Sequence, residues 1–150
     1  MKLKVGLLGA GSWGTTVASL TSKNAETIIW ARDKKTVEEI NSNKTNEKYL
    51  PKATLHKELK ASNSIKETVE NADVIVMGIP SQSFRTVLTE AKSFIRPWVP
   101  IVSLAKGLEI STKMRMSEII EEVMPCNMYI GYFFFCISYF CTSTNSRYKS

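Results

Sequence analysis

Short apolar runs alternate with segments of helical periodicity along the first 125 residues, and a glycine-rich turn follows the first apolar run. A third observation is the apolar run of residues 73–79, whose β-branched character is typical of a strand buried on both faces of a parallel sheet. Together these patterns predict an α/β fold of the Rossmann type, with a doubly wound, mostly parallel sheet. We expect this sheet to be incomplete and to be followed by an atypical C-terminal tail.

The predicted elements follow one another as βα units. Strands are expected at residues 3–8, 26–30, 60–62, 73–79 and 100–104, and helices at 13–23, 34–41, 65–71, 81–94 and 113–124. Ser64 followed by Glu67 predicts a capping box at the start of the third helix. Residues 43–60 interrupt the pattern as an excursion, which we expect Tyr49 to anchor to the domain.

The turn between the first strand and the first helix carries Gly9, Gly11 and Gly14. This spacing suits a dinucleotide pyrophosphate, because Gly9 tolerates a tight turn, Gly11 lets the backbone approach phosphate and Gly14 lets helix and strand pack closely. The helix that follows directs its free N–H groups and positive dipole end at the pyrophosphate. A purely structural turn is the alternative, but the flanking strand and helix favour nucleotide binding.

Composition excludes several classes of function. The chain has 20 Lys and Arg against 14 Asp and Glu, a net charge of +6, but the lysines are scattered among acidic residues. No basic patch alternates with stacking aromatic residues, so we expect no nucleic-acid partner. The only histidine, His56, lies far from the three cysteines, so we expect no metal site. The first strand leaves no room for a targeting peptide, which predicts a cytoplasmic protein.

Composition changes after Pro125. Eight of the 14 aromatic residues lie between positions 129 and 148, and no acidic residue follows Glu122. The apolar stretch is shorter than the roughly 20 residues that a membrane-spanning helix needs, so no membrane span is expected. We expect residues 1–125 to form a dinucleotide-binding domain and residues 126–150 to be a tail foreign to the fold, whose uncharged aromatic run favours aggregation or a homodimer.

Five segments, in order along residues 3–125, resemble the NAD(P)-dependent sn-glycerol-3-phosphate dehydrogenase family. They are the glycine turn with Trp13, the stretch Trp30-Ala31-Arg32-Asp33, the stretch Tyr49-Leu50-Pro51, the stretch Pro80-Ser81-Gln82-Ser83-Phe84-Arg85 and the stretch Lys106-Gly107-Leu108-Glu109. The resemblance implies hydride transfer between C2 of a small phosphate substrate and the nicotinamide of NAD or NADP. The reaction it implies interconverts sn-glycerol 3-phosphate and dihydroxyacetone phosphate.

The resemblance also implies roles for single residues. The pyrophosphate and the adjoining ribose would be held by Gly9, Gly11, Ser12, Trp13 and Gly14. Arg32 would lie beside the adenine ribose, Pro80 and Phe84 would border the nicotinamide, and Lys106 would contact both cofactor and substrate. Three of these side-chain roles have an alternative: a surface pair of Arg32 with Asp33, a core position for Phe84 and a solvated turn for Lys106.

Arg32 also bears on the choice of cofactor. NAD-specific enzymes usually carry an acidic residue at the end of the second strand, whereas a guanidinium can pair with the 2′-phosphate of NADP. Arg32 occupies that position here and Asp33 follows it. The sequence therefore leaves both NAD and NADP open.

No catalytic residue is expected within the chain. The resemblance places the general-base lysine in a helical second domain, and residues 126–150 stand where the segment leading to that domain is expected. Without the base and a substrate-phosphate pocket, we expect a fragment that binds cofactor but lacks full activity. The alternative is a stand-alone nucleotide-binding or interaction protein whose tail pairs with another chain.

Overall fold

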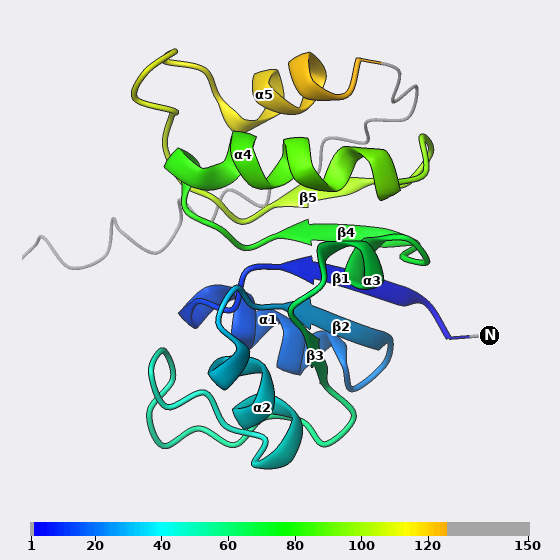
Figure 1. Ribbon diagram of the computed structural model, residues 1–150, viewed down its shortest axis with the longest axis vertical. Coiled ribbons are helices and arrows are strands. Elements are labelled where there is room, and N and C mark those ends of the chain that lie inside the picture. Colours follow the sequence, from blue (N-terminus) through cyan, green and yellow to red (C-terminus); the bar gives the residue numbers. More distant parts are fainter. Residues whose placement is uncertain (1, 126–150) are drawn as a thin grey trace, which may run out of the picture.

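A parallel sheet of five strands, in the order β3-β2-β1-β4-β5, forms the centre of the computed structural model, which describes residues 2–125 (Figure 1). The strands are β1 (Lys4–Leu8), β2 (Glu26–Trp30), β3 (Lys60–Ser62), β4 (Val74–Met77) and β5 (Ile101–Ser103). The helices are α1 (Ser12–Thr21), α2 (Lys34–Ser42), α3 (Ile65–Val69), α4 (Ser81–Ala91), the 3-10 turn η1 (Lys92–Phe94) and α5 (Met116–Val123). The prediction of a Rossmann-type α/β fold is confirmed. The predicted tail lies outside the described residues.

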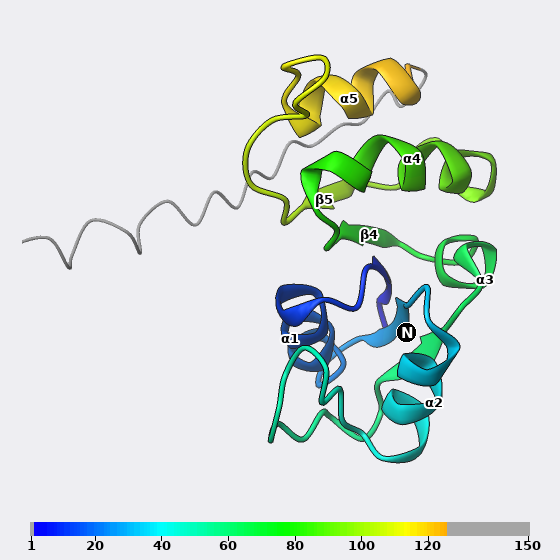
Figure 2. The ribbon, with the colours of Figure 1, turned by 60° about the vertical axis from the view of Figure 1, so that its left-hand side comes forward.

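Helices cover both faces of the sheet because successive strand side chains point to opposite faces. Leu8 and Met77 enter a core formed with α3, α4 and α5. Leu7 and Val76 enter a second core, formed with α1, α2 and the segment between α2 and β3. In Figures 1 and 2, α5 lies beside α4 at the end of the molecule beyond β5. No helix within residues 2–125 is long and apolar enough to cross a membrane.

Several predicted boundaries differ from the structure, and two of the differences bear on the site. The last helix begins at Met116, three residues later than expected, because Lys113 adopts a left-handed conformation with φ of 61° and the chain is still turning there. The strand predicted at residues 73–79 covers only β4, since the chain leaves the sheet at Gly78, whose amide still donates to Leu8. Gly78 and the residues after it are thereby free to form the wall of a cavity.

The capping box at α3 is only half formed. Ser64 is the N-cap, and its hydroxyl accepts a hydrogen bond from the Glu67 amide at 3.3 Å. The Glu67 carboxylate does not return to the Ser64 amide; it accepts from the Ser62 hydroxyl, and the Ser64 amide donates to that same Ser62 oxygen at 3.0 Å. The predicted helix start is therefore confirmed, whereas the predicted reciprocal bond is replaced by a relay through Ser62.

The excursion at residues 43–60 is anchored by a different residue from the one expected. Tyr49 is 41% exposed, whereas Asn46 is completely buried. The Asn46 amide donates to the Ala10 carbonyl at 3.0 Å and to the Thr15 hydroxyl at 2.8 Å, which ties the excursion to the glycine turn and to α1. Tyr49 is thus left at the surface, and a buried polar side chain supplies the anchor.

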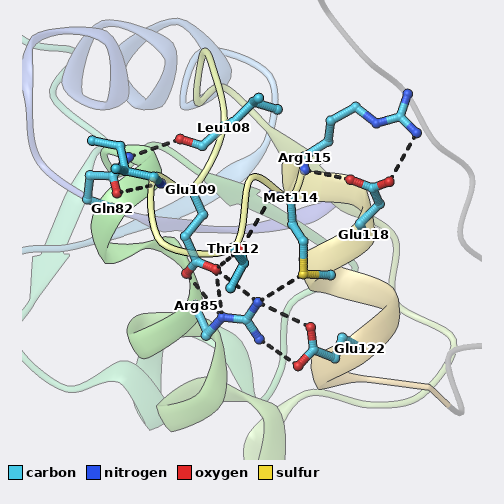
Figure 3. A network of polar contacts seen from close by, with 10 residues as sticks. Gln82, Arg85, Leu108, Glu109, Thr112, Met114, Arg115, Glu118 and Glu122 are labelled. Atoms are coloured by element: carbon cyan, nitrogen blue, oxygen red, sulfur yellow. Dashed lines mark hydrogen bonds and ion pairs between the residues drawn. The ribbon is translucent and has the colours of Figure 1, made fainter.

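A network of polar contacts joins α4 to α5 through residues 104–115, here called the Lys106 loop (Figure 3). Arg85 on α4 forms a forked pair with Glu109 of the loop, with nitrogen–oxygen distances of 3.0 to 3.1 Å. Its other side reaches Glu122 on α5 at 2.9 Å. Thr112 donates to the same Glu109 carboxylate. One guanidinium therefore holds three segments together.

These contacts shift the ionisation of both partners. Hydrogen bonds from Arg85, and then from Thr112, lower the pKa of Glu109 below its ordinary value of 4.5, although burial opposes them. Hydrogen bonds to Glu109 and Glu122 in turn raise the pKa of Arg85. Both groups are therefore charged at neutral pH, which is the state that a forked pair requires.

Replacing Phe84 by Ala is expected to destabilise the domain by about 3–5 kcal/mol, because the ring is fully buried and its loss leaves a cavity. Urea unfolding followed by circular dichroism measures the change. Phe94→Ala is the matched control: Phe94 is 38% exposed, so its truncation should cost roughly 1 kcal/mol. Equal losses at the two positions would contradict the assignment of Phe84 to the core.

Stability should also fall in acid. A carboxyl whose folded-state pKa is depressed stabilises the fold fully above its ordinary pKa, here 4.5, and loses that contribution as the pH falls through the folded value. Glu109→Gln should therefore be less stable than the wild type near neutral pH, and the two should converge in acid. Urea midpoints measured from neutral pH to about pH 3 test this.

Other carboxyls set the acid sensitivity that remains in the Glu109→Gln variant. Hydrogen bonds from the Lys4 amide and from Arg96 lower the pKa of Asp73. Those from the Arg115 amide and side chain lower the pKa of Glu118. The variant should thus keep part of the acid decline, and two parallel curves would show that Glu109 contributes nothing to it.

Candidate cofactor site

A cavity of about 400 Å³ opens at the carboxyl edge of the sheet, where the chain leaves β1 and β4 towards opposite sides. In open parallel sheets this reversal point is where ligands bind. The turns after β1 and β4 lie on the same side of the molecule, at the left in Figure 1. The cavity is lined by Gly9, Ala10, Gly11, Trp30, Ala31, Arg32, Asp33, Thr36, Lys48, Tyr49, Gly78, Ile79, Pro80 and Ser83.

Three glycines bring α1 into contact with the ends of β1 and β4. Gly9 has a φ of 115°, which side-chain-bearing residues rarely adopt. A Cβ on Gly14 would lie 2.0 Å from the Gly9 carbonyl oxygen, and one on Gly78 would lie 3.0 Å from the Gly14 Cα. The predicted packing role of Gly14 agrees with this geometry, and Gly78 is a third member that the sequence did not single out.

Gly11 differs from these three glycines. A Cβ built on it meets nothing within 4 Å, so no protein atom requires a glycine there. It is also the N-cap of α1, and no side chain caps the helix at this position. The first-turn N–H groups of α1 therefore remain available to an anion, and the open space at Gly11 gives a phosphate access to them. A dinucleotide pyrophosphate fits both features.

Ser12 and Trp13 do not line the cavity. The Ser12 hydroxyl donates to the Tyr49 carbonyl at 2.7 Å, so its side chain fastens the excursion to the start of α1. The Trp13 side chain is 57% exposed. Contacts of these two residues with a cofactor stay predictions, and backbone N–H groups are the donors that the geometry offers.

The cavity carries two cations in its lining. Arg32 and Lys48 line it, and the Lys48 ammonium lies 5.2 Å from the centre of the Tyr49 ring. Asp33 contributes the only acidic side chain of the lining, and one of its oxygens accepts the Lys35 amide at 3.0 Å as the N-cap of α2. Among residues 2–125 no ion pair joins Arg32 to Asp33, so the surface pair considered for them does not form.

Pro80, Phe84 and Lys106 come from the β4 and β5 side. Pro80 lines the cavity and precedes α4. Phe84, one turn further along α4, is completely buried in the core, so its side chain does not reach the cavity. Lys106 is exposed and follows β5 at the same edge of the sheet, but it is not part of the lining. The structure thus gathers Gly9, Gly11, Arg32 and Pro80, and it leaves Phe84 and Lys106 outside the wall.

Sequence reasoning missed two residues that shape this site, Asn46 and Lys48. Asn46 holds the glycine turn through the Ala10 carbonyl, and Lys48 adds a second cation to the wall. Both lie in an excursion without periodicity, so no pattern marked them. Within the described part of the chain, no group of three or more His, Cys, Asp or Glu side chains is placed to bind a metal ion.

The sequence model of the family described as NAD-dependent glycerol-3-phosphate dehydrogenase N-terminus matches residues 4–134. The chain is 58% identical over 125 residues to the NAD(P)+ glycerol-3-phosphate dehydrogenase 2 of Sphingopyxis alaskensis, covering 83% of this chain and 38% of that protein. It is 51% identical over 123 residues to the Mycobacterium avium enzyme of the same kind, covering 81% of this chain and 36% of that protein.

Solved structures agree. The glycerol-3-phosphate dehydrogenase of Coxiella burnetii superposes with a TM-score of 0.74 at 30% identity, over 82% of this chain and 38% of that one. The enzyme of Saccharomyces cerevisiae gives a TM-score of 0.75 at 28% identity, over 83% and 40% of the two chains. The chain therefore spans less than half the length of these relatives, and it belongs to the NAD-dependent glycerol-3-phosphate dehydrogenase family, matching its N-terminal part.

Proposed function

We propose that this chain is the cofactor-binding part of a dehydrogenase that interconverts sn-glycerol 3-phosphate and dihydroxyacetone phosphate, with NAD or NADP as cofactor. The observation that carries the proposal is the open space at Gly11 beside the uncapped N-terminus of α1, within the 400 Å³ cavity. The match of this chain to the N-terminal family model and the names of its relatives support the same function. The proposed domain is residues 1–125, with residues 126–150 as a segment that does not belong to it.

The cofactor would lie across the carboxyl edge of the sheet. Gly9 and Gly11, with the first N–H groups of α1 at Ser12, Trp13 and Gly14, would hold the pyrophosphate. The adenine ribose would lie beside Arg32, and the nicotinamide would lie towards Pro80. Phe84 supports that end from the core beneath α4 rather than by contact. When bound, the nicotinamide supplies the hydride that is exchanged with C2 of the substrate.

Lys106 is the proposed contact for substrate and nicotinamide. Lys106 follows β5 at the carboxyl edge, and a fixed cation there would stabilise negative charge that develops on the substrate oxygen. We assign no general base to residues 2–125. The chain covers only 38% of the Sphingopyxis alaskensis relative, and we propose that the base belongs to the part of such enzymes that it does not cover.

The walls of the cavity favour acceptance of NADP alongside NAD. Arg32 and Lys48 are two cations of the lining, and Arg32 follows β2, where the adenine ribose would lie, so a 2′-phosphate there would meet a guanidinium. Asp33 keeps one carboxylate oxygen for a ribose hydroxyl, because its other oxygen caps α2. A cytoplasmic location and a homodimer also stay predictions, which cell fractionation and light scattering can test.

Gly11→Ala is expected to weaken the binding of NADH and NADPH by about tenfold or more, because the added methyl group fills the space that the pyrophosphate needs. Its melting temperature should fall only slightly, since the new Cβ meets nothing within 4 Å and the cost is that of a weaker N-cap. Energy transfer from the tryptophans, of which Trp30 lines the cavity, to the reduced nicotinamide reports binding.

Gly14→Ala is the matched control for that experiment. The same methyl group, three residues later, would lie 2.0 Å from the Gly9 carbonyl oxygen and should lower the melting temperature. If Gly11→Ala binds NADH as tightly as the wild type does, the glycine turn is not the pyrophosphate site and the proposed function fails.

The 150-residue chain is expected to bind NADH without oxidising it in the presence of dihydroxyacetone phosphate, because no general base is assigned within it. Absorbance of the reduced nicotinamide measures turnover, and a full-length relative serves as the positive control. Turnover by the chain alone would show that its residues suffice for proton transfer.

A further inference from the structure

The position of the Lys106 ammonium is not fixed by contacts of its own. Within residues 2–125 it has no hydrogen-bond or ion-pair partner, and residues Lys106 to Leu108 are exposed. Before Lys106, Leu104 and Ala105 pack against the two cores. After it, Leu108 and Ile110 are 45% and 67% exposed, so burial does not hold that side of the loop. Contacts of the loop backbone must therefore hold the chain after Lys106.

Gln82 forms hydrogen bonds to that backbone through both the nitrogen and the oxygen of its side-chain amide (Figure 3). Its nitrogen donates to the Leu108 carbonyl at 3.0 Å, and its oxygen accepts from the Ile110 amide at 3.0 Å. Gln82 lies on the first turn of α4, between Pro80 and Ser83, both of which line the cavity. The two hydrogen bonds therefore fix the position of the Lys106 loop relative to the cavity wall.

Arg85 holds the next residue of the loop. Glu109 is 6% exposed, and it lies between the two loop residues that Gln82 grips. Its carboxylate receives the Arg85 fork at 3.0 to 3.1 Å, while its backbone amide donates to the Met114 carbonyl at 2.9 Å and closes the loop on itself. A planar fork fixes direction as well as distance, which a single ammonium cannot do.

We propose that Gln82 and Arg85 are positioning residues for Lys106, which hold the Lys106 loop against α4 so that the ammonium faces the nicotinamide end of the cavity. The inference rests on the proposed function, since it takes Lys106 as the contact for cofactor and substrate. Neither Gln82 nor Arg85 need touch a ligand. They act on binding only through the loop, and their effect should vanish when the Lys106 ammonium is absent.

Two probes separate this role from general stability. NADH carries the nicotinamide, whereas ADP-ribose carries the adenine and the pyrophosphate without it. Gln82→Met removes both hydrogen bonds at similar side-chain length, and Lys106→Met removes the ammonium.

Gln82→Met should weaken NADH binding about fivefold and leave ADP-ribose binding within about twofold. A fivefold loss of affinity corresponds to about the net free energy of one hydrogen bond. In a chain that already carries Lys106→Met, Gln82→Met should not weaken NADH binding further.

Arg85→Lys keeps the positive charge but loses the forked pair with Glu109. It should likewise weaken the binding of NADH and leave the binding of ADP-ribose unchanged. Two controls match these changes. Thr86→Met places the same new side chain at an exposed site one turn along α4. Arg96→Lys alters the arginine that pairs with Asp73 at 3.3 Å, next to the start of β4 and away from its carboxyl end. Both controls should bind NADH as the wild type does, and melting temperatures are recorded for every variant.

The outcomes are distinct. If the wild type binds NADH but Gln82→Met or Lys106→Met binds it equally well, the positioning role is refuted while the proposed function stands. Equal weakening by Gln82→Met with and without Lys106 also refutes it, because the effect then does not pass through the ammonium. If the wild type binds neither NADH nor ADP-ribose, the proposed function itself fails. Should Arg85→Lys not fold, the exposed Gln82 still decides the question.

Discussion

The contact among Gly9, Gly14 and Gly78 is the constraint on which the rest of the structure depends. Helix α1 can start at the crevice between β1 and β4 only because its first turn carries no Cβ at Gly14, where even a methyl group would overlap the Gly9 carbonyl oxygen. This close approach directs the N-terminus of α1 at the carboxyl edge of the sheet. The cavity exists because the helix, the turn and the end of β4 meet there without side chains between them.

Polar contacts hold the glycine turn in place. A glycine-rich turn has little side-chain packing of its own, and here Asn46 and Ser12 tie it to the excursion through the Ala10 and Tyr49 carbonyls. The same contacts bring Lys48 and Tyr49 to the cavity wall, which Arg32 also lines from the end of β2. Cations that are distant in the chain thus share one cavity, where their field favours an anionic ligand.

The far side of the molecule is held differently. Both ends of the Lys106 loop pack against the apolar cores through Leu104, Ala105 and Met114. Its middle is held to α4 and α5 by the side chains of Gln82, Arg85 and Glu109 (Figure 3). Hydrogen bonds of this kind specify direction more than they add stability. A loop that must present one side chain at a fixed place gains from such contacts, because Leu108 and Ile110, on the far side of Lys106 from β5, are exposed and supply no apolar packing there.

The sequence by itself determined the fold class, the order of the elements and the glycine turn, because strand and helix periodicity and the φ of Gly9 are local properties of the chain. It also marked Arg32 and Pro80, which follow β2 and β4 at the edge where parallel sheets bind ligands. Only the tertiary structure decided that Phe84 is core, that Ser62 replaces half of the predicted capping box, and that Asn46, Lys48 and Gln82 shape the site. These roles depend on contacts between segments far apart in the chain, and no local pattern encodes such a contact.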